Sequence, residues 1–281
     1  MDDSYSFMGM PPDLSTHGGS LDNLNFWVHV IMAILFIGWG TFFVYTLFRF
    51  RAGKNPTANH AGVKSHASSY LEVLVAVVEV VLLFGLAIPL WAERVDITFL
   101  TEGPDEAARE RVVEVRIVAQ QFAWNIHYPG PDGKFGKTDV QFVDADTNPV
   151  GLDEKDEAGK DDIVTNNDFA VPVDRPILVR LTTKDVIHGF SLPTMRVKHD
   201  AIPGMEIPLW FQAKGTTADY KQAMFDKAKA AGDTELESPD QVRDMEIACA
   251  QLCGNSHYRM KGTFKILDEE GFKKFLADYT Y

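Results

Sequence analysis

FWVHVIMAILFIGWGTFFVYTLF, from Phe26 to Phe48, lies inside a run of 26 residues between Asp22 and Arg49 that contains no Asp, Glu, Lys or Arg. A helix needs about 20 apolar residues to cross the hydrocarbon layer of a membrane. A helix on the surface of a soluble protein would keep a polar stripe, and this stretch has none. The sequence therefore predicts a transmembrane helix here.

A second apolar segment follows, VLVAVVEVVLLFGLAIPLW from Val73 to Trp91, and Glu79 is its one charged residue. It is shorter than the first, and a buried helix of a soluble core is the alternative interpretation. We predict a second transmembrane helix, so that residues 1–95 form an N-terminal tail and a transmembrane hairpin in the lipid bilayer.

The charges that flank the two segments predict their orientation. The connecting loop is basic and has no acid, whereas the N-terminal tail is acidic and has no base. Basic loops stay in the cytoplasm, so both ends of the hairpin are expected outside it. The N-terminus lacks a basic region followed by a short apolar core and a cleavage site, so no cleavable signal peptide is expected. The charged residues are Arg49, Arg51, Lys54 and Lys64 in the loop and Asp2, Asp3, Asp13 and Asp22 in the tail.

The 190 residues after Trp91 have the pattern of an all-β domain, which we assign to residues 96–281. Short runs rich in Val, Ile and aromatic residues alternate with turn residues, a pattern typical of a sandwich or Greek-key barrel. Residues 144–168 are expected to form an acidic surface loop, and residues 218–232 and 271–279 to form helices. The runs read as strands are Val112–Tyr128, Pro176–Thr183, Glu206–Gln212, Met245–Cys249 and Gly262–Leu267.

The overall composition excludes some classes of protein. The 281 residues include 27 Lys and Arg against 40 Asp and Glu, a formal net charge of −13. A nucleic-acid-binding chain needs basic patches, so no nucleic acid partner is expected. Two cysteines are too few for a disulfide framework. The part after Trp91 has a charge of −11, which would attract a basic partner.

The stretch ACAQLCGNSHYRMKG contains Cys249, Cys253, His257 and Met260, which together have the composition of a metal site. A disulfide would leave the histidine and methionine unexplained. Structural zinc would use Cys and His in a tetrahedral cage, and a blue-copper site needs only one thiolate. Chance clustering is the remaining alternative.

The second thiolate favours a pair of metal ions. Two thiolates four residues apart can bridge two copper ions, and each copper would then need an imidazole. A second histidine must therefore come from elsewhere in the chain. His188, which follows the predicted strand at residues 176–183, is the best candidate, and His199 is the alternative.

These features resemble subunit II of haem–copper cytochrome c oxidases. The resemblance rests on DVIHGFSLP at 185–193, KHDAIPG at 198–204, the Cys249-x3-Cys253-Gly254-x2-His257-x2-Met260 motif and the hairpin with Glu72 and Pro89. It covers roughly residues 24–128 and 174–267. The family implies a cupredoxin-like Greek-key barrel that holds a dinuclear copper (CuA) centre. The ligands implied are His188, Cys249, the backbone carbonyl of Gln251, Cys253, His257 and Met260.

The resemblance also implies roles outside the copper ligands. The family often has a glutamate at the position of Gln251, where it helps bind magnesium at the subunit I interface. Gln251 has no carboxylate, which leaves the magnesium contact open. Asp200 matches an interface aspartate, with a turn residue as the alternative. Glu72 matches the glutamate at the mouth of a proton channel, with an interfacial position as the alternative. Glu79 has no family role.

The resemblance also implies that two aromatic residues form the place where electrons enter. The family often has Gln-Trp-x-Trp where this chain has Gln121-Phe122-Ala123-Trp124, so Phe122 and Trp124 hold the two aromatic places. The alternative is packing within a strand, because aromatic residues favour strands.

The resemblance thus implies the electron-input subunit of a cytochrome c oxidase in a bacterial cytoplasmic membrane, with its C-terminal domain on the periplasmic side. Cytochrome c would donate electrons to CuA, and haem in subunit I would receive them and reduce O2 to water with proton pumping. Catalysis would belong to subunit I and not to this chain. A Cys-x-x-Cys-His motif is absent, so haem is expected only in the partner.

Three alternatives differ in what they explain. A nitrous-oxide-reductase-like CuA domain would not account for the hairpin or for KHDAIPG. Quinol-oxidase second subunits lack the copper ligands. A membrane-tethered copper-binding or assembly module without a catalytic partner would keep both the anchor and the ligands, and it is the principal alternative.

Overall fold

The computed structural model describes residues 6–57, 60–62, 64–102, 109–144 and 147–279. The chain divides into two compact units, and each is described by itself. Ser20–Glu93 forms the helical unit, and the other described residues form the β unit.

The helical unit contains the two predicted apolar helices. Helix α1 runs over Gly18–Arg49, and the second segment consists of α2 at Ala67–Leu82, a π-helical turn at Leu83–Ala87 and α3 at Ile88–Val95. Both are long and apolar enough to cross a membrane, with mean hydropathies of 2.1 and 2.8, and none of the residues in either apolar window is buried. A core helix of a soluble protein would bury these side chains, so a membrane is the environment that suits them.

The break between α2 and α3 has a local cause. Pro89 has no N–H with which to reach the carbonyl of Gly85, as an α-helix would require. The wider turn at Leu83–Ala87 lies directly before it and changes the hydrogen-bond register there. The second helix therefore continues past the proline instead of ending at it.

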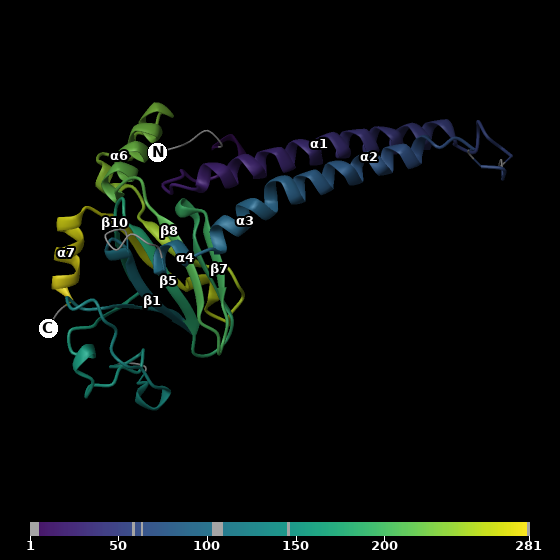
Figure 1. Ribbon diagram of the computed structural model, residues 1–281. Helices are drawn as coiled ribbons and strands as arrows, with labels where there is room; N and C mark the ends of the chain where they lie inside the picture. Colours follow the sequence, from purple (N-terminus) through teal and green to yellow (C-terminus); the bar gives the residue numbers. More distant parts are fainter. Residues whose placement is uncertain (1–5, 58–59, 63, 103–108, 145–146, 280–281) are drawn as a thin grey trace. The chain divides into compact units, whose positions relative to one another are not determined.

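The β unit contains two five-stranded sheets (Figure 1). Their orders are β3-β2-β1-β5-β8 and β4-β10-β9-β6-β7, and each sheet contains one parallel pair, β1 with β5 or β4 with β10. Neighbours that are not consecutive in sequence show that the chain crosses between the sheets. This is the predicted fold, a cupredoxin-like β-sandwich that follows two apolar helices in the sequence. The strands are β1 Val113–Gln120, β2 Ala123–Tyr128, β3 Ile163–Asn166, β4 Asp168–Pro172, β5 Pro176–Thr183, β6 His188–Leu192, β7 Val197–Ala201, β8 Ile207–Gln212, β9 Met245–Cys249 and β10 Lys261–Leu267.

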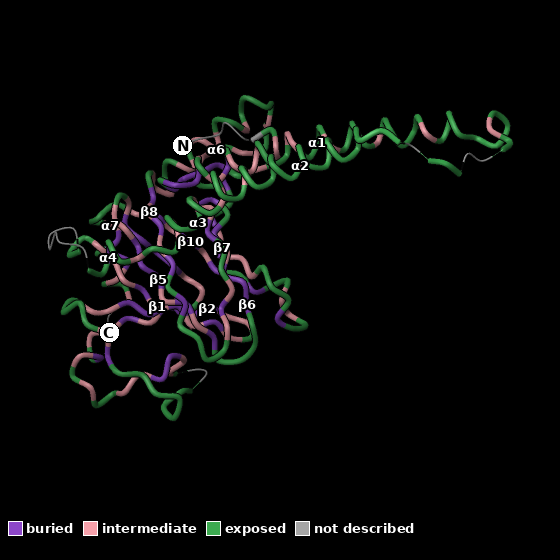
Figure 2. The backbone as a smooth tube through the Cα atoms, turned by 45° about the vertical axis from the view of Figure 1, so that its right-hand side comes forward, coloured by how far each residue is buried: buried purple, intermediate pink, exposed green. Residues whose placement is uncertain are grey.

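The core lies between the two sheets, where the strands are buried (Figure 2). Alternate residues of β1 are fully buried, as the two-residue period of a strand with one covered face requires. Aromatic rings fill the centre, and Phe169 contacts Phe190, Phe211 and Phe264 with ring centroids 5.4–6.5 Å apart. The contacts with Phe190 and Phe211 are edge-on, an arrangement that stabilises a core beyond the effect of the buried area alone.

The predicted long strand at Val112–Tyr128 is two strands. β1 and β2 pair antiparallel, with Gln120 opposite Ala123, so Gln121 and Phe122 form the turn between them. Neither residue is a glycine, asparagine or aspartate, the residues that usually mark such a turn, and the sequence therefore gave no turn signal. This turn later proves to lie beside the candidate metal centre.

The predicted insertions are partly confirmed. Helix α6 covers Thr217–Ala230 and helix α7 covers Glu269–Asp278, as expected, and a short helix α4 lies at Thr98–Thr101. The acidic stretch at residues 144–168 is not all loop, because its end, Ile163–Asn166, pairs with β2 as an edge strand. Ile163 and Thr165 are buried there and alternate with more exposed residues, as in a strand. This alternation is short and follows a run of acidic residues, so the sequence does not mark it clearly as a strand.

The N-terminal tail packs on the β unit. Ser15 forms a bridge with Ala213 just past β8, and the Leu14 amide donates to the Thr194 carbonyl at 2.9 Å. Leu14 is 1% exposed, and the buried Asp13 carboxylate lies 2.9 Å from the Lys214 ammonium. The tail thus covers the edge of the sheet, where unpaired backbone groups would otherwise lie.

Candidate metal centre

Three strand ends bring the predicted ligands together. His188 begins β6, Cys249 ends β9, and these two strands pair antiparallel with Phe190 opposite Cys249. The loop from residue 250 to 260 then leads into β10, which pairs with β9. The sheet therefore places a histidine and a cysteine that are 61 residues apart in sequence at one end of the sandwich.

Gly189 allows the loop to approach β6 closely. The Ala250 amide donates to the Gly189 carbonyl at 2.8 Å. A Cβ atom on residue 189 would lie 2.9 Å from the backbone of Ala250 and Gln251. A side chain at this position would push the loop away from His188, so glycine is required by this close contact.

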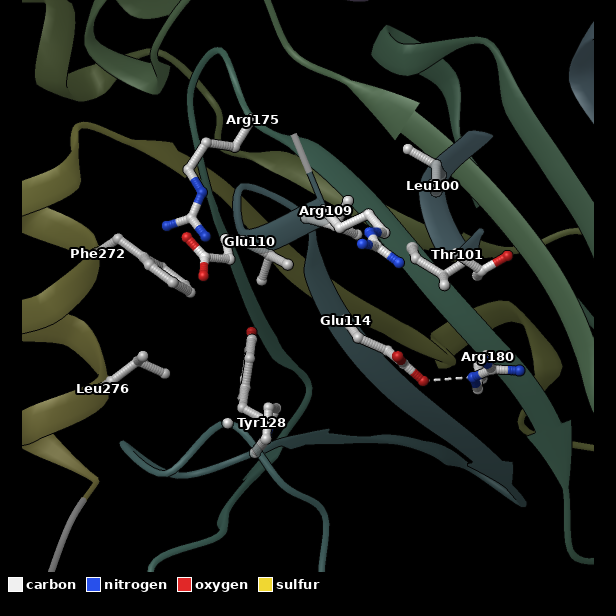
Figure 3. Close-up of a pocket in the computed structure, with 15 residues that line it drawn as sticks. Leu100, Thr101, Arg109, Glu110, Glu114, Tyr128, Arg175, Arg180, Phe272 and Leu276 are labelled. Carbon is white, nitrogen blue, oxygen red and sulfur yellow. Dashed lines mark hydrogen bonds and ion pairs between the residues drawn. The ribbon is translucent and has the colours of Figure 1, made fainter. Parts of the chain in front are cut away.

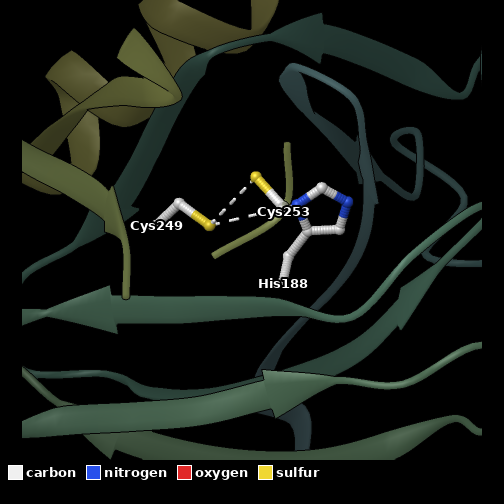
Figure 4. A group of neighbouring side chains, drawn as sticks. All are labelled: His188, Cys249 and Cys253. Carbon is white, nitrogen blue, oxygen red and sulfur yellow. Dashed lines mark hydrogen bonds between the residues drawn. The ribbon is translucent and has the colours of Figure 1, made fainter. Parts of the chain in front are cut away.

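The two thiols are the centre of the site (Figure 4). Both cysteines are free, with their Sγ atoms 3.8 Å apart. Cys249 Sγ lies 3.9 Å from His188 Nδ1 and 3.3 Å from the Gln251 carbonyl oxygen. The ligand atoms of His188, Cys249 and Cys253 all lie within 4.8 Å of one another, which is the arrangement of a possible metal site.

The remaining two predicted ligands contact Cys253. Its Sγ atom lies 3.6 Å from His257 Nδ1 and 3.7 Å from Met260 Sδ. All six predicted donors are therefore neighbours in one cluster of two thiols, two imidazoles, a thioether and a carbonyl. Soft sulfur donors with imidazole suit copper better than hard cations, so this donor set fits the metal implied by the family resemblance.

Burial affects the acid–base state of the Cys253 thiol. Cys253 is 4% exposed. Burial, with the neighbouring Cys249, raises the pKa of Cys253 to about 11. A metal ion must displace the thiol proton, because the thiolate is the ligand.

His188 is held from its other side by an acid. Its imidazole is fully buried, and its Nε2 lies 2.8 Å from Asp185 Oδ1. Burial opposes ionisation of Asp185, but hydrogen bonds from the Gln121 amide, His188 and the Val186 amide outweigh it and lower the pKa of this carboxyl. Asp185 is therefore a carboxylate at neutral pH.

The two predicted electron-entry residues differ in their surroundings. The Phe122 ring lies against the loop from residue 250 to 260, called the metal loop below. A Cβ atom on Gly254 in this loop would come within 3.1 Å of the ring. Trp124 is fully buried and packs edge-on against His188, with ring centroids 6.2 Å apart. Phe122 is thus the half-buried member of the pair, and Trp124 belongs to the core behind the histidine.

The other predicted site residues lie outside the cluster. Asp200 is on β7, paired with Gly189. His199, the alternative ligand, is exposed, and its Nδ1 lies 3.3 Å from the Asp200 carbonyl, so it is not part of the group. Glu72 and Glu79 are exposed on α2 in the helical unit. Their predicted roles concern partners and stay predictions.

Sequence reasoning missed three residues beside the site. Asp185 precedes His188 by three positions, a spacing that would have suggested a local hydrogen bond. The Gln121 side chain donates to the Cys253 carbonyl at 2.5 Å. Gly254 has φ +139°, which favours glycine. The contacts of Gln121 and Gly254 depend on the unmarked turn between β1 and β2.

A cavity elsewhere in the β unit has an apolar wall and charged side chains (Figure 3). Its volume is about 590 Å³, and Tyr128, Phe272 and Leu276 line one side. Its charges are mostly paired within the fold, since Arg180 bonds to Glu114 and Arg175 to Glu269. None of its lining residues is a predicted ligand.

Comparison with known proteins supports the family resemblance. Residues 113–224 match the family model described as "Cytochrome C oxidase subunit II, periplasmic domain". The resemblance to cytochrome c oxidase subunit II is confirmed. The match includes His188 but ends before Cys249, so the assignment of the metal loop rests on its own donor atoms.

Relatives of subunit II align over most of the chain. The alternative cytochrome c oxidase subunit 2 of Bradyrhizobium diazoefficiens is 28% identical over 268 residues, covering 94% of this chain and 81% of the relative. Cytochrome c oxidase subunit 2 of Cereibacter sphaeroides is 25% identical over 276 residues, covering 95% and 78%. The crystal structure of the periplasmic domain of subunit II from Bradyrhizobium japonicum is 25% identical, with a TM-score of 0.36 over 59% of this chain and 92% of that one.

Proposed function

We propose that this chain is the electron-input subunit of a haem–copper terminal oxidase. It accepts electrons from cytochrome c and delivers them to haem in subunit I, where O2 is reduced to water with proton pumping. The observation that carries the proposal is the cluster of six donors around Cys249 and Cys253, in a chain that resembles oxidase subunit II. Reduction of oxygen belongs to the complex, because the proposed site of that reaction is in subunit I.

The proposed ligands are His188, Cys249, the Gln251 carbonyl, Cys253, His257 and Met260. When bound, a dinuclear copper centre would supply a one-electron redox couple. The two thiolates would offer the sulfur atoms, and each histidine would offer Nδ1, which lies near Cys249 Sγ for His188 and near Cys253 Sγ for His257. Four of the six donors come from one loop that starts and ends at paired strands, so the loop holds the donors in place with little reorganisation.

Phe122 and Trp124 are the proposed electron-entry residues. Phe122 lies against the loop from residue 250 to 260 at Gly254, and Trp124 packs edge-on against His188, so each ring contacts a different part of the site. The half-buried Phe122 would meet the electron donor, and the buried Trp124 would lie between the core and His188.

The partners follow from the charge and from the family. The part after Trp91 has 23 basic and 34 acidic residues, and this negative charge would steer a basic cytochrome c toward the domain. Asp200 is proposed at the interface with subunit I and Glu72 at the mouth of a proton channel into it. Gln251 offers no carboxylate to a magnesium ion at that interface.

The proposed location is a bacterial cytoplasmic membrane, with the β unit on the periplasmic side and other oxidase subunits beside the hairpin. The two apolar helices and the match to a periplasmic domain support this. The basic loop between the helices supports the orientation, because such loops stay in the cytoplasm.

Copper stoichiometry with the electron resonance spectrum tests the proposal on the full chain in detergent. Two copper ions per chain with the hyperfine pattern of a mixed-valence pair are expected. His188→Gln should lose this signal and His199→Gln should keep it. Zinc, or a single-copper spectrum, would refute the dinuclear centre.

Co-purification separates the oxidase subunit from the principal alternative. A haem-containing subunit should accompany the chain through affinity purification from its native membrane. Copper binding with no haem-containing partner would instead support a membrane-tethered copper-binding or assembly module.

A further inference from the structure

The two ring nitrogens of His188 face different groups. Nδ1 lies 3.9 Å from Cys249 Sγ, and Nε2 lies 2.8 Å from Asp185 Oδ1. A carboxylate only accepts hydrogen bonds, so Nε2 carries the proton of the neutral ring. The lone pair of Nδ1 then points toward the thiols, and Figure 4 shows this edge of the ring turned to Cys249. The hydrogen bond at one nitrogen thus decides what the other can do.

The Asp185 carboxylate is held by hydrogen bonds from residues outside its own loop as well as within it. Its Oδ2 accepts from the Gln121 amide at 2.7 Å, in the turn between β1 and β2. Its Oδ1 also accepts from the Val186 amide at 2.7 Å, and the Thr183 hydroxyl at the end of β5 lies 3.3 Å away. The carboxylate therefore has a set position relative to two strands of the opposite sheet.

Gln121 extends this contact to the metal loop. Its side-chain Nε2 donates to the Cys253 carbonyl at 2.5 Å. A Cβ atom on Gly254 would lie 2.8 Å from the same nitrogen, so the loop fits closely against the turn. The turn therefore contacts both sides of the site, His188 through Asp185 and Cys253 directly.

We propose that Asp185 is the positioning residue of the metal centre. It keeps His188 in the Nε2–H tautomer and directs Nδ1 toward Cys249. Gln121 connects the same carboxylate to the loop that contains Cys253. This rests on the proposed function, because it assigns His188 as a metal ligand. Outer partners of this kind orient the ligand, and their loss typically lowers metal affinity about 10- to 100-fold.

Two variants of the full chain in detergent test the proposal. Asp185→Ala removes the acceptor, and the chelator concentration needed to strip half the copper should fall about tenfold or more. Asp185→Asn keeps the shape and one acceptor oxygen but loses the charge. Its copper content should stay near the original, and its midpoint potential should rise, because a negative charge near the metals favours the oxidised state.

The chain contains a matched control. His127 Nε2 lies 2.6 Å from Asp162 Oδ2 in another buried pair, next to Phe135 and away from the thiols. Asp162→Ala should leave the chelator midpoint and the resonance spectrum unchanged in the folded protein. An equal loss of copper from Asp162→Ala would show that general destabilisation explains the result, and the proposal would be wrong.

The outcomes separate this inference from the proposed function. An original chain that binds no copper pair contradicts the proposed function. A normal copper pair with an unchanged chelator midpoint and spectrum in Asp185→Ala contradicts only the positioning role, even if the affinity for cytochrome c falls. If Asp185→Ala does not accumulate as folded protein, Asp185→Asn decides: a raised potential supports the role and an unchanged one rejects it.

Discussion

Two histidines of the β unit have similar first partners and different surroundings. His127 and His188 are both buried, and each bonds through Nε2 to an aspartate, at 2.6 Å to Asp162 and at 2.8 Å to Asp185. The rest of the His127 ring packs against Phe135, whereas the Nδ1 atom of His188 faces Cys249. An aspartate fixes an imidazole in both cases.

The two His–Asp pairs differ in the groups that surround the imidazole away from its aspartate. Asp162 has no exposed side-chain area, and its pair joins β2 to the chain just before β3. Asp185 is 30% exposed, and its pair lies beside two free thiols. The first pair lies among apolar and backbone groups of the fold, and the second orients a proposed metal ligand, so a His–Asp pair by itself does not indicate a metal site.

The largest expected effect comes from removing one of the two thiols, the groups that distinguish the surroundings of His188 from those of His127. Cys253→Ser leaves both His–Asp pairs intact but removes one of the two sulfurs proposed to bridge the metals, so the proposed dinuclear centre should be lost. Copper stoichiometry and the resonance spectrum measure this. Ser256→Ala in the same loop is the control and should keep the centre. Two coppers with an unchanged spectrum in Cys253→Ser would contradict the bridging assignment.

Breaking the other pair should affect stability and not copper. His127→Ala leaves the Asp162 carboxylate buried without its partner and removes the ring contact to Phe135, so the free energy of unfolding should fall by about 3 kcal/mol. Denaturant unfolding of the full chain in detergent measures the loss. Copper missing from the folded variant would show that this pair supports the metal centre after all.

His17 is a third buried histidine, and its Nδ1 has no hydrogen-bond partner among the described residues, in contrast to the imidazoles of the two pairs. Burial, with the positive charge of Arg94, lowers the pKa of His17 to about 4. The unfolded chain takes up this proton near pH 6.5 and the folded chain only near pH 4. Stability should therefore fall by about 3 kcal/mol as the pH drops from 6.5 to 4, and no further below that.

Unfolding curves of the full chain across this pH range measure the effect. His17→Gln should remove the pH dependence assigned to this group, whereas His199→Gln, at an exposed position, should leave it in place. An identical pH profile in the original chain and His17→Gln would mean that other groups cause the acid instability.

The smallest effect is expected at the thioether. Met260→Leu keeps the buried volume nearly constant and removes a weak ligand, so copper should stay bound while the midpoint potential shifts on the order of 50 mV, about 1 kcal/mol for one electron. Redox titration followed by optical spectroscopy measures the shift. Complete loss of copper would show that Met260 holds the metal and does not merely tune it.

Much of the site was predictable because its donors are local in sequence. Cys249, Cys253, His257 and Met260 lie within twelve residues, and their chemistry is evident from residue type alone. His188 was chosen over His199 because it follows a strand. The structure brings His188 to the thiols and leaves His199 exposed, through the pairing of β6 with β9.

The elements that sequence analysis missed are those without a local signal. The turn at Gln121 and Phe122 contains none of the usual turn residues, and the strand at Ile163–Asn166 is short and follows an acidic stretch. The packing of Leu14 and Ser15 beside Ala213 joins segments about 200 residues apart. Such pairings depend on the complete sheet, which no short window of sequence contains.

The sequence by itself determined the two apolar helices, the β character of the remainder and the soft donors of the metal loop, because run length, alternation and residue chemistry are properties of neighbouring residues. Only the tertiary structure decided which histidine reaches the thiols, that Asp185 holds this histidine, and that the tail covers a sheet edge. These depend on strands and turns that meet across long stretches of chain, and the hydrogen bond of 2.8 Å between His188 Nε2 and Asp185 leaves Nδ1 as the nitrogen nearer the thiols.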